Sequence, residues 1–359
     1  MDTQFQISAM SDLRYEVYDI RNAPFKIYGL YKSEEPGLFK RMPQDVADKV
    51  SPNVSKLNLN PAGGRIRFQT DSSFVAIKVK YEKIPSATPR AVALNVIGAF
   101  FFDLYADGEY KGSFLPMPGN VNTDMVIPSF PVDEEFESYI NLKSNSVKDI
   151  VIYFPSFAYI SQIYIALEEK AELKAGNTYV NEKPVVFYGS SITQGACASR
   201  PGNIYQNLLS QKWNMDYLNL GFSGSAKAEG EIIDYIGKIS MSCFVYDYDH
   251  NAPDAEYLKQ THLSSLQKIR DKHPDIPIII LSRPNQSAGK EESLKRQDII
   301  KRTYDYFKKK GDKQMYFVSG QNVFHSLNSN IMTVDGTHPN DFGFYCIAKE
   351  IEQVVTNNK

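Results

Sequence analysis

The pattern of apolar and polar positions along the chain changes near residue 170, and the part before that point is typical of β structure. Apolar side chains alternate with lysine and alanine in residues 75–81, which is the period of a half-buried strand. Asp107 and Gly108 lie between the apolar runs 101–105 and 110–114 and predict a tight hairpin, because both residues tolerate positive φ. Short strands separated by proline and glycine favour a β-sandwich of jelly-roll type. Further strands are predicted at residues 64–70, 150–154 and 161–167.

Residues from 184 onward show a different pattern, in which short apolar runs alternate with helical segments. Strict alternation of strands and helices predicts a parallel sheet with helices on both faces. Gly311 follows the fourth predicted helix and is expected to cap its C-terminus. Strands are predicted at residues 185–188, 217–221, 243–248, 276–281 and 314–319, and helices at 203–213, 226–239, 255–272, 291–310 and 341–355.

A charged stretch, residues 168–177, separates the two patterns. It lacks apolar alternation, so it is expected to be a linker or a short exposed helix. We place the domain boundary there and predict an N-terminal β-sandwich domain over residues 1–170 and a C-terminal α/β domain over residues 178–359. A length of 359 residues also favours two domains over one.

Charge and composition exclude several classes of partner. The net charge is -2 at pH 7, which gives no bulk attraction to nucleic acid or to an anionic membrane. No apolar stretch reaches about 18 residues, so no membrane span is expected. Three cysteines without a CxxC pair imply neither a disulfide framework nor a zinc site, and we expect no metal and no cofactor. The first residues carry no secretory signal, so we expect a cytoplasmic protein, or a periplasmic or secreted one if a leader has been removed.

Polar motifs follow the predicted strands of the C-terminal half, at the point where each strand ends. Ser191 follows the first strand, Gly224 follows the second, Asn251 follows the third, and residues 335–339 come after the fifth. Because the carboxyl ends of parallel strands lie along one edge of a sheet, we expect these residues to converge. A serine at such an edge is a candidate nucleophile.

A serine nucleophile needs a base, and His338 is the best candidate among the five histidines. Asp335 lies three residues before it, so one turn can hold both the base and the acid that fixes its tautomer. His250 adjoins the same sheet edge and stays open as an alternative base. The remaining histidines are not expected to act as the base: His262 and His273 belong to a surface helix and should be solvated, and His325 lies in a loop without a nearby acid.

Acyl transfer also needs hydrogen-bond donors for the negative charge that develops on the carbonyl oxygen. The backbone N–H groups of Ser191 and Gly224 and the side-chain amide of Asn251 are the candidates for this oxyanion hole. Asp249 and Arg283, which follow the third and fourth strands, are candidates for contacts with substrate. For Arg283 an ordinary salt bridge is the alternative.

Four segments of the C-terminal half resemble, in order, the four sequence blocks of the SGNH, or GDSL, hydrolases: residues 189–193, Gly224, Asn251 and residues 335–339. The resemblance covers residues 184–355. It implies a flavodoxin-like α/β/α sandwich that hydrolyses esters without a cofactor. By the same resemblance Ser191 is the nucleophile, His338 the base and Asp335 the orienting acid, with Ser191, Gly224 and Asn251 as the oxyanion hole.

Two positions depart from the family pattern. Ser190 stands where the family has an acid before the serine, and Asp249 stands where the third block has glycine. The second change adds bulk and charge, so it is expected to narrow the pocket or to bring a carboxylate toward the substrate. In the N-terminal half, residues 101–105 resemble the Gly-x-Asp-Leu-Tyr segment of a β domain that precedes such hydrolases in some bacterial proteins, without the glycine.

These observations lead to the hypothesis of a metal-independent serine esterase that removes small O-acyl groups, such as acetate, from carbohydrates. The attached β-sandwich and the 23 tyrosines and 21 phenylalanines favour a sugar as the alcohol, although strand packing also explains the aromatic content. Two alternatives stay open. One is a thioesterase or lysophospholipase acting on longer acyl chains, and the other is an inactive carbohydrate-binding protein.

Overall fold

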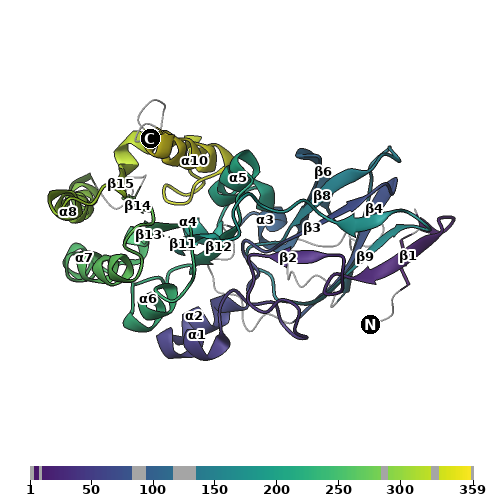
Figure 1. The fold of residues 1–359 in the computed structure, drawn as a ribbon, viewed down its shortest axis with the longest axis horizontal. Helices are drawn as coiled ribbons and strands as arrows, with labels where there is room; N and C mark the ends of the chain where they lie inside the picture. Colours follow the sequence, from purple (N-terminus) through teal and green to yellow (C-terminus); the bar gives the residue numbers. More distant parts are fainter. Residues whose placement is uncertain are drawn as a thin grey trace.

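The computed structural model describes residues 4–7, 10–82, 94–115, 135–283, 290–324 and 331–356. Figure 1 shows a β-rich half that contains the N-terminus beside an α/β half that contains the C-terminus. Within those ranges, no helix is long and apolar enough to cross a membrane.

The N-terminal half is a sandwich of two antiparallel sheets (Figure 1). Ile66 and Phe68 of one sheet and Ile77 and Ile165 of the other are completely buried in one shared core. The predicted β-sandwich is therefore confirmed. The first sheet has the order β1 (Tyr15–Asp19), β9 (Ile160–Glu168), β4 (Phe74–Tyr81), β7 (Glu135–Asn141), and the second has the order β10 (Leu173–Ala175), β3 (Arg65–Thr70), β8 (Lys148–Tyr153), β5 (Phe102–Ala106), β6 (Glu109–Phe114), with β2 (Lys26–Tyr28) also paired to β3.

The charged segment 168–177 differs from the prediction, because it contains a strand. Residues Leu173–Ala175 form β10, which pairs antiparallel with β3. An edge strand of three residues has one side open to water and tolerates charged side chains. It therefore shows no apolar alternation in the sequence.

The C-terminal half is a parallel five-stranded sheet with helices on both faces (Figure 1). Its first strand lies second in the sheet, which is the flavodoxin-like order, and the predicted α/β/α sandwich is confirmed. Helices α6 (Gly230–Ile236), α7 (Ala255–Lys272) and α8 (Lys290–Lys309) cover one face, and α5 (Tyr205–Trp213) and α10 (Asp341–Thr356) cover the other. The strand order is β12 (Tyr217–Gly221), β11 (Val185–Gly189), β13 (Cys243–Asp247), β14 (Ile278–Leu281), β15 (Met315–Val318).

Two helix ends illustrate how local backbone conformation sets the boundaries. Helix α6 is shorter than the predicted 226–239, because Ala228 has a φ of 58°, and the left-handed region is incompatible with a continuing α-helix. Gly311 has a φ of 86° after α8, and its N–H donates to the carbonyl of Lys308 at 3.0 Å. The predicted glycine cap is therefore present.

Two short helices that the sequence pattern does not reveal link the two halves. Helices α1 (Gln44–Val50) and α2 (Pro52–Asn58) come from the N-terminal part of the chain. Ala47 and Val54 nevertheless pack in the same core as Val186 of β11 and Ile233 of α6. Helices of seven residues have little stability of their own, so this tertiary burial is what holds them.

A buried arginine joins these helices to the parallel sheet. Arg41 is 1% exposed, and its guanidinium donates to the carbonyls of Asn219 and Gly221 in β12 at 3.1 and 2.5 Å and to that of Leu57 in α2 at 2.5 Å. It also stacks on Phe222, 4.5 Å from the ring centre. Burial lowers the pKa of Arg41 to about 9, and the carbonyl dipoles replace the lost water around its charge.

Replacing Arg41 by methionine tests this link. The variant keeps an unbranched apolar stem but leaves three buried carbonyls without that donor, and each unsatisfied buried group costs about 1–3 kcal/mol. We expect Arg41→Met to lower the free energy of unfolding by more than about 2 kcal/mol in chemical denaturation. Arg14→Met is the control, since the Arg14 side chain is 87% exposed and its loss should cost less than about 0.5 kcal/mol. Equal stabilities of the two variants would contradict the account.

Candidate active site

Ser191 lies where β11 ends, at the start of the short helix α4 (Ser191–Gln194). Its neighbour Ser190 is the N-cap of this helix, and the Ser190 hydroxyl accepts the N–H of Ile192 at 3.2 Å. A serine caps a helix about as well as an aspartate does, which explains why this departure from the family pattern leaves the local turn intact. Ser191 is 7% exposed, so the turn presents a nearly buried hydroxyl.

Glycines allow the strands around Ser191 to approach this closely. A Cβ atom on Gly189 would lie 2.2 Å from the carbonyl oxygen of Asp247 in β13, and one on Gly221 in β12 would lie 2.2 Å from the backbone nitrogen of Gln194. Neither position can hold a side chain without moving the backbone of a neighbouring element. The sheet edge is therefore tightly closed around the start of α4.

His338 and Asp335 share one turn, and the structure brings both to Ser191. The Nε2 atom of His338 is 2.9 Å from Ser191 Oγ, and its Nδ1 atom is 2.7 Å from Asp335 Oδ2. Asp335 Oδ1 accepts the N–H groups of Thr337 and His338 at 2.9 and 2.8 Å. Partial burial alone would raise the pKa of Asp335, but these hydrogen bonds hold it below its ordinary value.

This electrostatic arrangement determines which nitrogen of His338 can act as a base. An ionised Asp335 carboxylate only accepts hydrogen bonds, so Nδ1 carries the proton. Nε2 of the neutral ring is then the acceptor that faces the Ser191 hydroxyl. The arrangement can remove a proton from that hydroxyl during attack on a carbonyl carbon.

Gly224 and Asn251 flank Ser191 from the two neighbouring strands. Gly224 follows β12 with a φ of 68° and open space at its Cα, and Asn251 ends the 3-10 turn (Asp249–Asn251) after β13. The side-chain oxygen of Asn251 accepts the N–H of Ala226 at 3.1 Å, which ties the two loops together. Since the oxygen is engaged by the backbone, the amide nitrogen is the end of Asn251 that is available to donate to a ligand.

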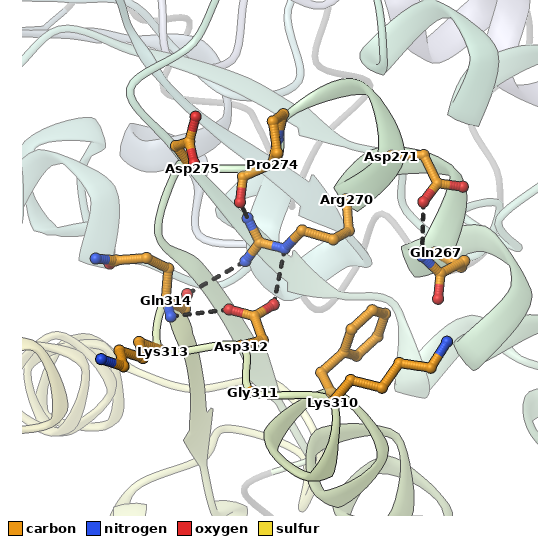
Figure 2. Close-up of a pocket in the computed structure, with 11 residues that line it drawn as sticks. Gln267, Arg270, Asp271, Pro274, Asp275, Lys310, Gly311, Asp312, Lys313 and Gln314 are labelled. Carbon is orange, nitrogen blue, oxygen red and sulfur yellow. Dashed lines mark hydrogen bonds and ion pairs between the residues drawn. The ribbon is translucent and has the colours of Figure 1, made fainter.

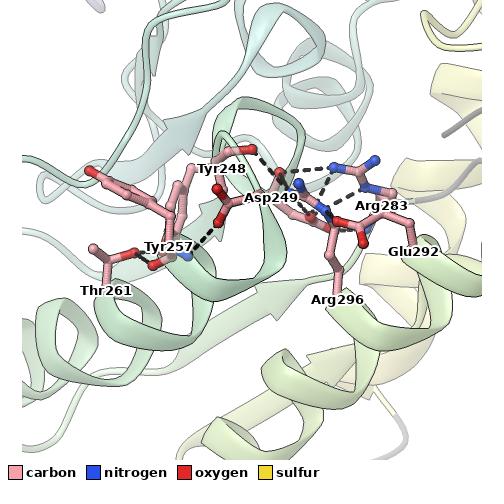
Figure 3. Close-up of polar contacts among 9 residues, drawn as sticks. Tyr248, Asp249, Tyr257, Thr261, Arg283, Glu292 and Arg296 are labelled. Carbon is pink, nitrogen blue, oxygen red and sulfur yellow. Dashed lines mark hydrogen bonds and ion pairs between the residues drawn. The ribbon is translucent and has the colours of Figure 1, made fainter.

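Asp249 and Arg283 lie at the same edge, but in a buried ion-pair network rather than at an open surface (Figure 3). The Asp249 carboxylate accepts the N–H of Arg283 at 2.9 Å and its guanidinium at 3.1 and 3.2 Å. Arg296 of α8 donates to the Asp249 carbonyl at 3.0 Å and to its carboxylate at 3.3 Å. Burial would raise the pKa of Asp249, but Arg283 and the further partners hold it below its ordinary value.

For Arg283 the structure shows the salt bridge that the sequence left open as the alternative, and its partner is Asp249, the other residue suggested for substrate contacts. The Asp249 side chain is fully buried and the Arg283 side chain is 7% exposed, so each already satisfies the other. Asp249 in place of the family's glycine therefore anchors the turn that carries Asn251. The contact of Arg296 with Asp249 was not predicted from the sequence, because nothing in a helix pattern distinguishes an arginine that reaches a distant carboxylate from a solvated one.

The other described histidines differ from His338 in their burial and in their hydrogen-bond partners. The Nε2 atom of His250 is buried and has no hydrogen-bond partner among the described residues, and burial and Arg283 lower the pKa of His250 to about 3. His262 is 1% exposed, which corrects the expectation that it is solvated, and its Nδ1 is 2.9 Å from Thr303 Oγ1 between α7 and α8. His273 lies at the end of α7, 3.1 Å from the carbonyl of Gly237. His325 lies outside the described residues.

A cavity of about 680 Å³ lies away from this edge, at the end of α7 and α8 and just before β15 (Figure 2). Its central Arg270 donates to the carbonyls of His273, Pro274 and Ile276 and pairs with Asp312 at 2.9 Å. The guanidinium of Arg270 is therefore engaged by backbone carbonyls and by Asp312. A smaller cavity of about 260 Å³ borders Gly224 itself and is lined by Ser51, Asn53, Lys227 and Glu229.

Comparisons with known proteins agree with this fold. A sequence profile of the GDSL-like lipase/acylhydrolase family matches residues 182–356, and a profile of the GxDLY N-terminal domain of SGNH-hydrolase-type esterases matches residues 15–173. No curated protein matches the sequence. A solved structure named as a GDSL-like lipase, from Bacteroides ovatus, is 26% identical with a TM-score of 0.80, over 96% of this chain and 98% of that chain.

Two more distant structures share the fold. A salicylyl-acyltransferase from a tetracycline biosynthetic pathway is 15% identical with a TM-score of 0.74, over 96% of this chain and 97% of that chain. An acetyl xylan esterase from the rumen bacterium Butyrivibrio proteoclasticus is 13% identical with a TM-score of 0.56, over 96% of this chain and 98% of that chain.

The fold, the site and the two profile matches define the class: this chain belongs to the SGNH, or GDSL-like, hydrolases. It is an ester hydrolase, and its N-terminal half is the GxDLY domain of that class. The resemblance of residues 101–105 to the marker of that domain is therefore confirmed, although the marker's glycine is replaced here by phenylalanine.

The Asp249 network makes a prediction for stability. Because the folded-state pKa of Asp249 lies below the ordinary value of 3.8, its contribution is present above that pH and is lost as the pH falls through the folded value. Asp249→Asn removes the carboxylate that pairs with the buried Arg283 guanidinium and one of the two carboxylates that Arg296 contacts, so we expect it to lower the free energy of unfolding at pH 7 by about 3–5 kcal/mol. The variant should also lose less stability than the wild type on acidification below about pH 4.

Denaturant unfolding at pH 7 and at pH 3 measures both effects. Asp305→Asn is the matched control, since Asp305 pairs with Lys301 on an exposed face of α8, and such pairs contribute about 0.5 kcal/mol or less. A loss for Asp249→Asn no larger than that of the control would contradict the assigned role.

Proposed function

We propose that this protein hydrolyses small O-acyl esters, acetyl esters first, on carbohydrates, by way of an acyl-enzyme on Ser191. The observation that carries the proposal is an unbroken series of two hydrogen bonds. One joins Ser191 Oγ to His338 Nε2 at 2.9 Å, and the other joins His338 Nδ1 to Asp335 Oδ2 at 2.7 Å. An intact series of this kind also favours catalysis over an inactive carbohydrate-binding role.

In the proposed reaction, Ser191 Oγ attacks the ester carbonyl carbon while His338 Nε2 takes the hydroxyl proton. The bond from carbon to the alcohol oxygen then breaks, and His338 returns the proton to the departing alcohol. Water attacks the resulting acyl-enzyme with His338 again as the base, and the carboxylic acid leaves. Asp335 holds the ring in the productive tautomer and stabilises the charge that His338 gains.

The proposed oxyanion hole consists of the N–H groups of Ser191 and Gly224 and the side-chain amide of Asn251. The Ala226 N–H that engages the Asn251 oxygen at 3.1 Å supports this role, because it leaves the amide nitrogen as the end of the side chain that donates. Losing one such donor typically costs about 3–4 kcal/mol of transition-state stabilisation. The buried Asp249 network anchors the 3-10 turn that ends at the same residue.

Three features support a carbohydrate as the alcohol. The cavity beside Gly224 is lined by hydroxyl, amide and charged groups, which suit a hydroxyl-rich ligand. Phe342 and Tyr345 are exposed, at 37% and 50%, on the first turns of α10 just after His338, and exposed aromatic faces are suited to sugar rings. An acetyl xylan esterase shares the two-domain fold, and the same class of substrate is our proposal for this protein.

Hydrolysis of p-nitrophenyl acetate by the wild type and by Ser191→Ala tests the nucleophile. We expect a loss of kcat/KM on the order of 10³-fold or more in the variant, with wild-type rates in Ser264→Ala, a control on the exposed face of α7. Burial and Arg283 lower the pKa of His250 to about 3, so His250 stays neutral from about pH 5 to 9 and should add no limb to the pH profile in that range. Equal rates for Ser191→Ala and the wild type would remove Ser191 from the reaction.

Acyl and alcohol preferences test the substrate class. We expect kcat/KM to fall by at least about tenfold from p-nitrophenyl acetate to the octanoate, and acetate to be released from acetylated oligosaccharides. Tyr345→Ala should raise KM for the oligosaccharide and leave p-nitrophenyl acetate hydrolysis unchanged. A preference for octanoyl esters or thioesters would instead favour the long-chain alternative.

A further inference from the structure

Asp103 of β5 lies at the boundary between the two halves. Its side chain is completely buried. Ser113 of the same sheet donates to its Oδ1 atom at 2.7 Å. The Oδ2 atom instead faces the α/β half, where it accepts the N–H of Gly202 at 2.7 Å and the guanidinium of Arg200 at 3.1 Å.

Neighbouring residues of the sandwich complete the contact site for Arg200 and Gly202. Arg200 also donates to the Tyr105 hydroxyl at 2.5 Å, and its guanidinium lies 3.8 Å from the centre of the Tyr110 ring. A Cβ atom on Gly202 would lie 2.4 Å from that Tyr105 hydroxyl and 2.9 Å from Asp103 Oδ2. The backbone at Gly202 therefore packs against the sandwich as closely as a glycine permits.

The loop of residues 199–203, which occupies this contact site, also binds the start of α10. Asp341, the first residue of α10 and the third after His338, accepts the N–H of Ser199 at 2.8 Å and its hydroxyl at 2.5 Å. Asn203 donates to the same carboxylate at 2.8 Å. Residues 199–203 are thus bonded to Asp103 on one side and to the helix that follows His338 on the other.

The same loop begins shortly after Ser191. Helix α4 ends at Gln194, and Cys197 adopts a left-handed φ of 72° before Ser199. A displacement of residues 199–203 would therefore act on both partners of the Ser191–His338 hydrogen bond, since one precedes the loop in the chain and the other precedes Asp341. A misplacement of about 1 Å can cost about 100-fold in rate.

We propose that Asp103 of the N-terminal domain is a positioning residue for the Ser191–His338 pair, acting through residues 199–203 and Asp341. This inference rests on the proposed function of Ser191 and His338. It assigns the N-terminal domain a part in catalysis that needs no contact with substrate. Asp103 and Tyr105, both from the segment 101–105, form hydrogen bonds across the boundary.

A double-mutant cycle tests the proposal with p-nitrophenyl acetate at saturation. Asp103→Asn and Asp341→Asn should each lower kcat by about tenfold or more, with KM little changed. Because both substitutions release the same loop, the double variant should lose little more than the worse single variant, whereas independent effects would multiply. The midpoint of the pH profile should also shift in Asp103→Asn.

Asp149→Asn is the matched control. Asp149 lies in β8 of the same domain, where its carboxylate pairs with Arg67 at 3.0 Å and accepts the N–H of Asn177. None of its side-chain hydrogen bonds and ion pairs within the described part of the chain reaches residues 199–203. We expect this variant to keep the wild-type kcat and pH profile, with any loss confined to thermal stability. Wild-type kcat and pH midpoint in folded Asp103→Asn, or a multiplicative loss in the double variant, would overturn the proposal.

Two further measurements keep the test decisive. If Asp103→Asn does not fold by circular dichroism, Tyr105→Phe removes one hydrogen bond to Arg200, and its loss of kcat should again fail to multiply with that of Asp341→Asn. If the wild type shows no Ser191-dependent activity on any ester, the proposed function has failed. The effect of Asp103→Asn on the His338 imidazole signal in NMR titrations then tests the positioning role alone, and an unchanged signal overturns it.

Discussion

The position of Ser191 depends on buried polar contacts to a helix of only four residues. Helix α4 is too short to be stable by itself, so its place must be set by its neighbours. The carbonyl of Thr193 accepts the side-chain amides of Asn219 and Gln206, both at 2.7 Å, and its hydroxyl donates to Asp247 at 3.1 Å. Two strands and helix α5 therefore hold the turn that presents the Ser191 hydroxyl.

Gln194, the last residue of α4, extends this control to the other half of the molecule. Its side-chain nitrogen donates to the carbonyl of Ser156 at 3.0 Å and to the side chain of Asn60 at 3.2 Å, both from the N-terminal part of the chain. Its side-chain oxygen accepts the N–H of Ser223, next to Gly224, at 3.0 Å. A fully paired buried amide specifies one geometry, so this side chain connects the sandwich, the Ser191 turn and the Gly224 loop.

The two halves are consequently not independent modules joined by a linker. Arg41 bonds to the backbone of β12 from the N-terminal part of the chain, and helices α1 and α2 complete the core on one face of the parallel sheet. Gly63, at a φ of 80°, lies so close to β12 that a Cβ atom would be 2.7 Å from Asn219 Cβ. Residues of the N-terminal half therefore contact the parallel sheet that carries Ser191 and help to fix its position.

Sequence reasoning identified the parts of the site that depend on local pattern. Ser191 follows an apolar strand, and Asp335 and His338 share one turn, so strand periodicity and a three-residue spacing made them candidates, with His250 still open as a base. The resemblance to the SGNH hydrolases then implied their roles. Sequence reasoning did not find the contacts of Arg296 and Gln194 or the ion pair between Arg200 and Asp103, because these side chains meet partners far away in the chain. It offered Asp249 and Arg283 as candidates for substrate contacts, with a salt bridge as the alternative for Arg283, since composition alone cannot distinguish an open charged edge from one closed by a second arginine.

Trapping of the acyl-enzyme tests the central claim most directly. After rapid acid quenching of the reaction with p-nitrophenyl acetate, mass spectrometry of proteolytic peptides reports which side chain carries the acetyl group. The account predicts a transient acetyl group on the peptide that contains Ser191, formed and lost at rates consistent with turnover and lost more slowly when His338 is replaced by glutamine. Steady turnover with Ser191 unmodified, or an acetyl group that turns over on another residue, would contradict it.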